Sequence, residues 1–129
     1  MSNFVFKTPK EALKWAKENG PSDESRKMAS TDPNTSIYYA YDVDKGPSTV
    51  TRDGACQTPR GAYFYAMNID ECPCEQTRNV ASKDPQWAFQ YADYLDKKSH
   101  PVTWSGVAGT YMENLYAECR GMPDWCEGY

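Results

Sequence analysis

Proline recurs along this chain at a nearly fixed interval, and this interval constrains the fold more than any other feature. The nine prolines form two interleaved series. The first series is Pro9, Pro33, Pro59 and Pro85, and the second is Pro21, Pro47, Pro73, Pro101 and Pro123. Neighbours within a series lie 22 to 28 residues apart, and 26 is the commonest spacing. A fixed period of this length is typical of repeat proteins, in which each repeat is one supersecondary unit.

Alanine follows the same period and fixes the unit boundaries. Alanines recur three residues after a first-series proline, seven residues after it, and at the end of each unit. An aromatic residue precedes each alanine of the second group: Trp15, Tyr39, Tyr65, Tyr91 and Tyr116. The units therefore span residues 6–29, 30–55, 56–81 and 82–108, with a truncated fifth unit at 109–129. We expect residues 1–129 to form a single helical-repeat domain.

Each unit is predicted to contain two short helices. A Thr or Asp stands directly before every first-series proline, and an N-cap oxygen followed by proline is typical of a helix start. Positions three, six, seven and ten after the proline are small or apolar, which is helical rather than strand spacing. A second helix is expected to begin at each second-series proline. The predicted fold is all-α, a small solenoid of about four and a half helix-turn-helix repeats.

Arginine and aspartate also recur with the repeat. Each arginine of one column is followed 18 residues later by an aspartate near the end of the next predicted first helix. A carboxylate there is unfavourable against the helix dipole unless it is paired. The spacing therefore predicts three ion pairs that join successive units: Arg26–Asp44, Arg52–Asp70 and Arg78–Asp96. Tyrosine and arginine columns can also bind single-stranded nucleic acid. The pI of about 4.9 argues against a nucleic-acid partner here.

One face of the predicted first helices is the candidate binding surface. Positions five and eight after the proline point away from the core stripe. They are polar in the first and fourth units, but in the second and third they are Tyr38, Tyr41, Phe64 and Met67, with Arg60 at the edge. Exposed apolar patches of this kind often mark partner sites. The alternative is that this face packs against the second helices, which would make the four residues core.

The repeated phrase resembles sequences of known type. The pattern Asp-Pro-x-x-Ala-x-x-Tyr-Ala, written in full at residues 84–92, resembles repeats of uncharacterised phage and large-virus proteins. The helix pairs are also loosely similar to tetratricopeptide and Sel1-like arrays, although this unit is shorter and lacks their signature positions. The resemblance covers residues 6–108. It implies a helical-repeat architecture and a viral source, but no activity.

The cysteines and the single histidine offer little catalytic chemistry. Five cysteines, an odd number, and an N-terminal segment without a secretory pattern predict free thiols in a reducing, cytoplasmic compartment, the host cytoplasm for a viral protein. Cys72 and Cys74 could bind a metal with Cys119, Cys126 or His100, but one intervening residue fits structural zinc sites poorly. Cys72 and His100 are expected to share a loop column with Gly20 and Gly46. We expect no metal and no cofactor, although a metal site at Cys72, Cys74 and His100 stays open.

The sequence favours a non-enzymatic module that binds a protein or peptide, because solenoids present extended surfaces and no catalytic residues stand out. One alternative is a small transferase, in which residues 60–65 resemble a strand of ADP-ribosyltransferases. Another is a virion or self-assembling component, and the oligomeric state stays open. No apolar run approaches the roughly 18 residues of a membrane span. Residues 3–6 and 125–129 are expected to cover the two ends of the stack, and Trp104 to lie in the column of Glu24, Val50 and Gln76.

Overall fold

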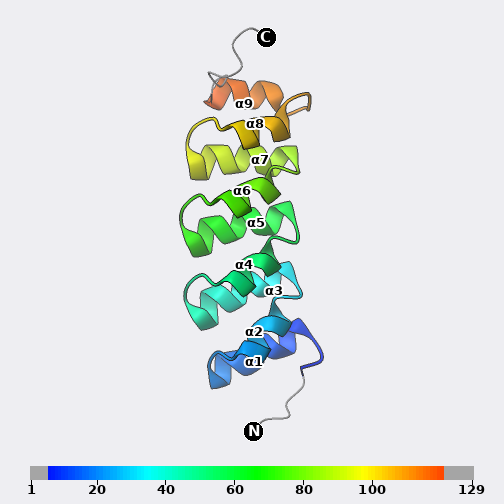
Figure 1. Ribbon diagram of the computed structural model, residues 1–129, viewed down its shortest axis with the longest axis vertical. Coiled ribbons are helices and arrows are strands. Elements are labelled where there is room, and N and C mark those ends of the chain that lie inside the picture. Colours follow the sequence, from blue (N-terminus) through cyan, green and yellow to red (C-terminus); the bar gives the residue numbers. More distant parts are fainter. Residues whose placement is uncertain (1–5, 121–129) are drawn as a thin grey trace.

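The computed structural model describes residues 6–120 and shows helices stacked along one axis, with the first and last described helices at opposite ends (Figure 1). The first helices of the five units are α1 (Pro9–Asn19), α3 (Pro33–Tyr38), α5 (Pro59–Tyr65), α7 (Pro85–Tyr91) and α9 (Glu113–Arg120). The second helices are α2 (Asp23–Ala29), α4 (Thr49–Ala55), α6 (Glu75–Ala81) and α8 (Pro101–Val107). The predicted all-α solenoid of helix-turn-helix repeats is confirmed.

The first helices of the four full units begin as the sequence predicts. Thr8, Asp32, Thr58 and Asp84 are the N-caps, and each side chain accepts a hydrogen bond from a backbone N–H in the first turn. The proline that follows occupies the start of the helix, where its missing N–H costs nothing. Each helix start is therefore fixed locally, before any packing between units.

Three of the first helices continue as a π-helix, which the sequence did not indicate. The segments are η1 (Tyr39–Asp44), η2 (Ala66–Asp70) and η3 (Ala92–Asp96). Each ends at a residue in the left-handed conformation, Lys45, Glu71 or Lys97. In the first unit the next N-cap lies 13 positions after the proline, whereas in the later units it lies 15 positions after it. The wide π-turn and the left-handed residue accommodate the two additional residues.

The second helices begin later than predicted in three of the four units. Their N-caps are Ser22, Ser48, Cys74 and His100, which are spaced 26 residues apart without exception. The prolines at 21, 47 and 73 stand before the cap and outside the helix, whereas Pro101 is the first residue of α8. The evenly spaced cap position, rather than the proline, marks where the second helix begins, and its side chain caps the helix in three of the four units. Aligning Pro101 with Pro73 therefore shifts the register of the fourth unit by two residues.

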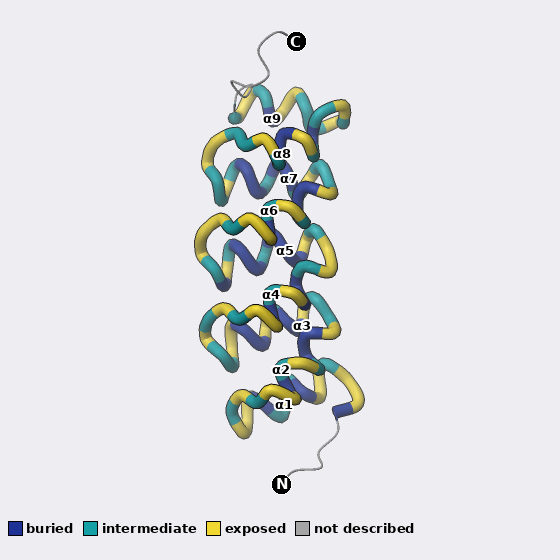
Figure 2. Tube along the Cα trace, viewed as in Figure 1, coloured by how far each residue is buried: buried dark blue, intermediate teal, exposed yellow. Residues whose placement is uncertain are grey.

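The core lies between a layer of first helices and a layer of second helices, and buried residues follow the stack along its length (Figure 2). The alanines that follow the first-series prolines are fully or almost fully buried, so the two layers approach closely. The tyrosines at 39, 65, 91 and 116 are completely buried. Each of these tyrosines packs against the buried residues of the preceding unit. The core of one unit is therefore completed by a tyrosine from the next unit.

Contacts between second helices alternate along the stack. Gly54 in α4 lies against the Ser30 carbonyl at the end of α2, and Gly106 in α8 lies against the Ser82 carbonyl in the same way. A side chain at either glycine would overlap with that backbone oxygen. Val80 occupies the equivalent position of α6. Glycine thus permits α4 to approach α2 closely and α8 to approach α6 closely, whereas a valine stands at the equivalent position of α6.

The N-terminal end of the described chain is covered by an aromatic pair. Phe6 is buried and meets the Trp15 ring edge-on, with the ring centroids 5.5 Å apart. This is the cover expected from residues 3–6, as far as the structure describes them. The cover expected from residues 125–129 lies outside the described residues. None of the helices between residues 6 and 120 has the length and apolar character needed to cross a bilayer.

Candidate functional site

A buried tyrosine hydroxyl joins each unit to the one before it. The Tyr65 hydroxyl lies 2.8 Å from the Thr51 hydroxyl, accepts from the Ser48 N–H at 3.0 Å and donates to the Ser48 carbonyl at 3.2 Å. The same arrangement recurs as Tyr39 on Ser25 and Ser22, Tyr91 on Thr77 and Cys74, and Tyr116 on Thr103 and His100. Burial raises the pKa of Tyr65, Tyr91 and Tyr116, so these phenols stay neutral donors.

An arginine lies over three of these tyrosines and pairs with an aspartate of the next unit. In the middle joint, the Arg52 guanidinium carbon is 5.5 Å from the Tyr65 ring centroid, and Arg52 Nη2 is 2.6 Å from Asp70 Oδ1. The other two predicted ion pairs, Arg26–Asp44 and Arg78–Asp96, have the same geometry at 2.8 and 2.6 Å. The hydrogen bonds to these aspartates raise the pKa of each arginine. These side chains join the units.

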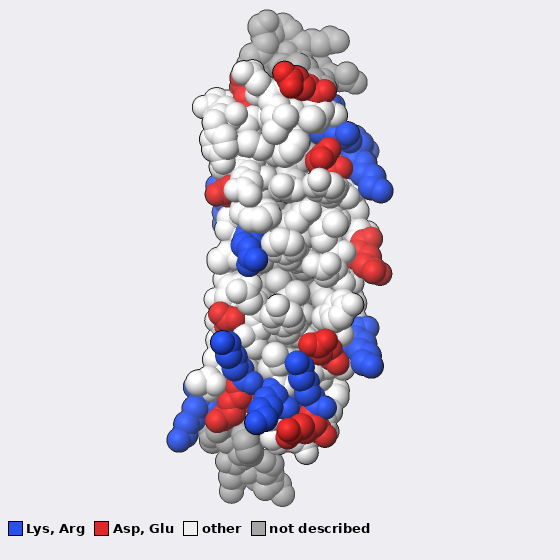
Figure 3. All heavy atoms as spheres, turned by 180° about the vertical axis from the view of Figure 1, so that it is seen from behind, with Lys and Arg blue, Asp and Glu red and all other residues white. Residues whose placement is uncertain are grey.

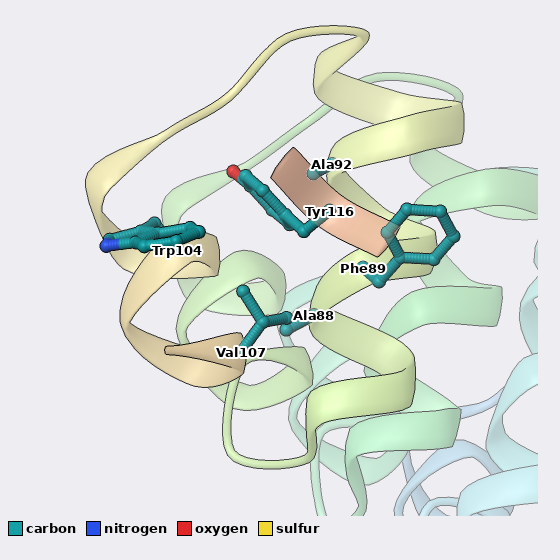
Figure 4. Close-up of a cluster of buried hydrophobic side chains, with 6 residues drawn as sticks. All are labelled: Ala88, Phe89, Ala92, Trp104, Val107 and Tyr116. Carbon is teal, nitrogen blue, oxygen red and sulfur yellow. The ribbon is translucent and has the colours of Figure 1, made fainter. Parts of the chain in front are cut away.

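The contact between α8 and α9, the last joint of the described chain, contains the tyrosine but has a tryptophan in place of the arginine. Trp104 packs edge-on against Tyr116, with ring centroids 5.5 Å apart, inside a cluster that includes Ala88, Phe89 and Val107 (Figure 4). Its position is 26 residues after Arg78, so it belongs to the arginine column. The expectation that it shares the column of Glu24, Val50 and Gln76 is wrong, because that expectation aligned Pro101 with Pro73.

The outer face of the first helices presents the candidate binding residues. Tyr38 is 58% exposed and Tyr41 is 62% exposed, so these two rings lie outside the core and the second helices do not cover them. Phe64 and Met67, at the same positions of the third unit, are half-buried. Phe64 contacts Tyr63 and Trp87, with ring centroids 5.1 and 5.6 Å away. The predicted patch therefore divides into two projecting tyrosines and a more buried part beside them.

Arg60 connects the two parts of this face. Its guanidinium carbon is 5.0 Å from the Phe64 ring centroid, and Nη1 donates to Asn34 Oδ1 at 3.2 Å. The side chain is exposed and reaches from α5 towards α3. Arg60, Asn34 and Phe64 thus form a fixed border to the space beside Tyr38.

Three grooves adjoin Tyr38 and Tyr41. A groove of about 240 Å³ between α3 and α5 is lined by Asn34, Ile37, Tyr38, Arg60, Phe64 and Asn68. A second, of about 600 Å³ between α1 and α3, is lined by Lys10, Leu13, Lys17, Asp32, Asn34, Thr35, Tyr38 and Asp42. A third, of about 480 Å³ between η1 and η2, includes Tyr41, Asn68 and Glu71. The two projecting tyrosines therefore stand between hollows on the same face.

Charge on this face is uneven. Figure 3 shows Lys and Arg together with Asp and Glu at the N-terminal end of the stack, while the middle is mostly uncharged. The exposed lysines of α1 are Lys10, Lys14 and Lys17. Lys17 lies 3.4 Å from Asp42, which projects from η1. Because Glu11 and Glu18 are also exposed on α1, the face has an end of mixed charge and an aromatic centre.

The cysteine and histidine residues do not assemble a site in the described range. Between Phe6 and Arg120, no group of three His, Cys, Asp or Glu side chains could hold a metal ion. Four cysteines of that range are free thiols: Cys56, Cys72, Cys74 and Cys119. Burial raises the pKa of Cys56 to about 11, which suppresses the reactive thiolate. His100 shares its column with Cys74, not with Cys72 as expected, since both are N-caps.

Residues 60–65 are helical. They belong to α5, which extends from Pro59 to Tyr65 as the repeat predicts, so they do not form the strand of the ADP-ribosyltransferase alternative. The helix follows from the Thr58 cap, whose hydroxyl accepts from the Gly61 N–H at 2.9 Å. Gly61 fits there because a side chain would overlap with the Ala55 carbonyl.

Sequence reasoning missed the joint formed by the tyrosine hydroxyl, although a signal was present. Ser25, Thr51 and Thr77 precede their tyrosines by 14 residues, and each N-cap precedes the same tyrosine by 17. A hydroxyl at a constant distance from a buried phenol in three successive units indicates a hydrogen bond between units, and the fourth pair, Thr103 and Tyr116, is one residue closer. The exposure of Tyr38 and Tyr41 is one of the two interpretations that the sequence left open.

Comparison with known proteins identifies no family for this chain. Family models, curated proteins and solved structures were each searched, and none matches the chain. Its function is therefore inferred from the architecture and from the chemistry of its surface.

Proposed function

We propose that this protein is a non-enzymatic module that binds a protein or peptide segment on the outer face of its first helices. The observation that carries the proposal is the exposure of Tyr38 and Tyr41, 58% and 62%, beside grooves on the same face. Tyrosine is common among the residues that dominate binding energy, and exposed aromatic surface often marks a partner site. Asn34 and Asn68 add amide donors and acceptors that suit a peptide backbone.

The rest of the molecule suits a scaffold for such a surface. Buried joints fix the spacing of successive first helices, so the grooves between them are preformed. A preformed groove binds at lower entropic cost than one that must be ordered on binding. Among the described residues, Arg26, Arg52 and Cys56 have strongly raised pKa values. Their roles are structural, since the two arginines are paired with aspartates and Cys56 is partly buried.

A random peptide library displayed on phage provides the test. Peptides selected on the native protein should bind the variant Tyr38→Ala with Tyr41→Ala at least about tenfold more weakly, a loss of about 1.4 kcal/mol or more. The matched control is Tyr94→Ala, because Tyr94 is 54% exposed on η3 of the fourth unit. Its binding should equal that of the native protein.

Stability measurements must accompany the binding assay. Both tyrosines are exposed, so the double variant should unfold within about 0.5 kcal/mol of the native protein. Failure to select any peptide, or equal binding by the double variant, would contradict the proposed function.

A further inference from the structure

Arg60 differs from every other arginine of the chain in having no carboxylate partner within residues 6–120. All five arginines lie in that range. Four of them form an ion pair with an aspartate: Arg26, Arg52, Arg78 and Arg120. No described carboxylate lies within ion-pair distance of Arg60. Its positive charge is therefore not neutralised by a neighbouring side chain.

The Arg60 guanidinium nevertheless has a defined position. Its carbon lies 5.0 Å from the Phe64 ring centroid, and Nη1 donates to Asn34 Oδ1 at 3.2 Å. Within the described chain, this is the one hydrogen bond that the guanidinium donates. The remaining N–H groups are left for a ligand, and their planar fork matches the two oxygens of a carboxylate.

The groove beside Arg60 is otherwise apolar or neutral. It lies between α3 and α5, has a volume of about 240 Å³, and is lined on its apolar side by Ile37, Tyr38 and Phe64. Arg60 is the only charged residue among those that line it. The two aspartates that line the groove between α1 and α3 are accompanied there by two lysines. The groove between α3 and α5 thus combines apolar walls with one unpaired cation.

We infer that this groove binds the C-terminal residue of a partner polypeptide, with a bulky apolar side chain against Tyr38 and Phe64 and the α-carboxylate on Arg60. The inference rests on the proposed function and specifies its partner. A cavity of about 150 Å³ holds a benzene ring, so the groove has room for one large side chain and its carboxylate. Side chains of neighbouring residues in an extended segment point to opposite sides. A terminal residue instead carries both groups on one Cα.

Two asparagines extend the recognition to the backbone of the bound chain end. Asn34 accepts from Arg60 through Oδ1, so its amide N–H groups point to other partners. Asn68 lines the same groove and adds a second amide. These amides suit the last peptide groups of the ligand, as in other sites that capture a terminal carboxylate. Recognition then depends on the chain end and one apolar side chain.

The test compares N-acetylated peptides that bind the full chain, measured by isothermal titration. The probe is acetyl-Gly-Ser-Gly-Ser-Phe with a free C-terminus. Its two partners are the same peptide with an amidated C-terminus, which removes the charge, and the free acid that ends in Ser, which removes the ring. The probe should bind at least about tenfold more tightly than either, the usual effect of losing a hydrogen bond between charged groups or a buried aromatic side chain.

The variant Arg60→Gln separates recognition from stability. It should bind the free acid and the amide with equal affinity, whereas a variant that was merely destabilised would weaken both and keep the preference. Arg60 is exposed, so the fold should be unaffected. Lys83→Gln, which removes another exposed cation outside the groove, is the matched control and should retain the tenfold preference for the acid.

Three results would overturn the inference. One is no binding of the probe, or equal binding of the acid and the amide by the native protein. Another is a preference for the acid that persists in Arg60→Gln. The third is binding as tight as that of the probe by the amidated peptide ending in Phe-Asp, whose charge is on a side chain, or by N-acetylphenylalanine, which is no polypeptide. If phage-selected peptides need Tyr38 and Tyr41 but the free acid has no advantage, the proposed function survives and this inference fails.

Discussion

The joint between the third and fourth units and the joint that holds α9 share a tyrosine but differ in what lies beside it. Tyr91 packs under Arg78, which is paired with an almost completely buried Asp96. Tyr116 packs against Trp104. Both hydroxyls make equivalent bonds, to Thr77 and Cys74 in one joint and to Thr103 and His100 in the other. The hydroxyl bond is thus the constant part of a joint, and the ion pair is an addition to it.

In the described part of the chain, the ion pair is formed only where the first helix of the following unit ends in a π-helical segment. Asp96 is the last residue of η3, and Asp44 and Asp70 end η1 and η2 in the same way. Each π-turn places a carboxylate against the arginine of the preceding unit. In α9, as far as Arg120, the helix has no π segment. Where no such segment follows, an aromatic ring covers the tyrosine instead.

The largest expected effect separates an interior tyrosine from the last one. Tyr65→Ala should destabilise the whole stack by about 3–5 kcal/mol, the range for truncating a buried aromatic. Tyr116→Ala should release α9 and leave the first four units folded, because repeat proteins lose terminal elements independently. Urea titration followed by circular dichroism distinguishes a shifted midpoint from a small loss of helical signal. Equal midpoint shifts in the two variants would contradict this view of the joints.

The ion pair gives the next largest effect. Asp96→Asn should cost about 2–4 kcal/mol, because it leaves the Arg78 guanidinium without its buried counter-charge. The double variant Arg78→Met with Asp96→Leu should cost much less, within about 1 kcal/mol, since apolar replacement of a buried pair is often neutral. Chemical denaturation of the single and double variants measures the coupling. A double variant as unstable as Asp96→Asn would show that the charges are indispensable to the interior joint.

Glycine substitutions test the close approach of second helices. Gly54→Ala should destabilise by about 1–3 kcal/mol despite the better helix propensity of alanine, because its methyl group would overlap with the Ser30 carbonyl. Gly46→Ala is the matched control, since a methyl group there meets no atom within 4 Å. Its melting temperature should be unchanged or slightly higher. Similar losses at both positions would mean that space between α2 and α4 is not the cause.

A stabilising change is expected at the cap of α6. The Cys74 side chain makes no capping hydrogen bond, whereas Ser22 and Ser48 in the same column do. Cys74→Ser should therefore raise stability by about 0.5–1 kcal/mol, the usual contribution of a serine cap. Thermal melts in reductant measure the gain. Cys72→Ser, an exposed neighbour outside the helix, should produce none.

The smallest effect concerns pH and the cap of α8. His100 Nδ1 accepts from the Val102 N–H at 3.1 Å, and burial lowers the pKa of this histidine, as does the charge of Arg78. Lys98 also lowers the pKa, and Asp96 opposes the shift. Because the folded pKa lies below the unfolded value of about 6.5, this contribution is intact above pH 6.5. It is lost progressively as the pH falls below 6.5 towards the folded pKa.

His100→Asn tests that titration, because asparagine caps helices well and does not ionise. Unfolding free energy of the native protein should fall by less than about 1 kcal/mol between pH 7 and pH 5 through this group. The variant should show a correspondingly smaller fall. Identical pH profiles for the two proteins would show that the His100 cap does not contribute to the pH dependence.

The fold was largely predictable because its signals are local or strictly periodic. Thr58 and Pro59 mark a helix start within two residues, and the 18-residue spacing of Arg52 and Asp70 is visible without a structure. The π-turns were not predictable, since two additional residues in a unit fit a longer loop as well as a wider helix. The different exposures of Tyr38 and Phe64 depend on Trp87 of the following unit, and helical periodicity within one unit carries no such information.

The hydroxyl joints also determine how such a molecule could change in length. The caps at 22, 48, 74 and 100 are evenly spaced, so duplicating any 26-residue block from the middle units preserves every pairing and adds one layer. Tryptophan replaces a joint residue in two units. Trp15 stands in the tyrosine column without a phenolic hydroxyl, and Trp104 stands in the arginine column without a charge. The tyrosine and arginine joints therefore repeat through the interior blocks, and tryptophan interrupts the two columns in the first and fourth units.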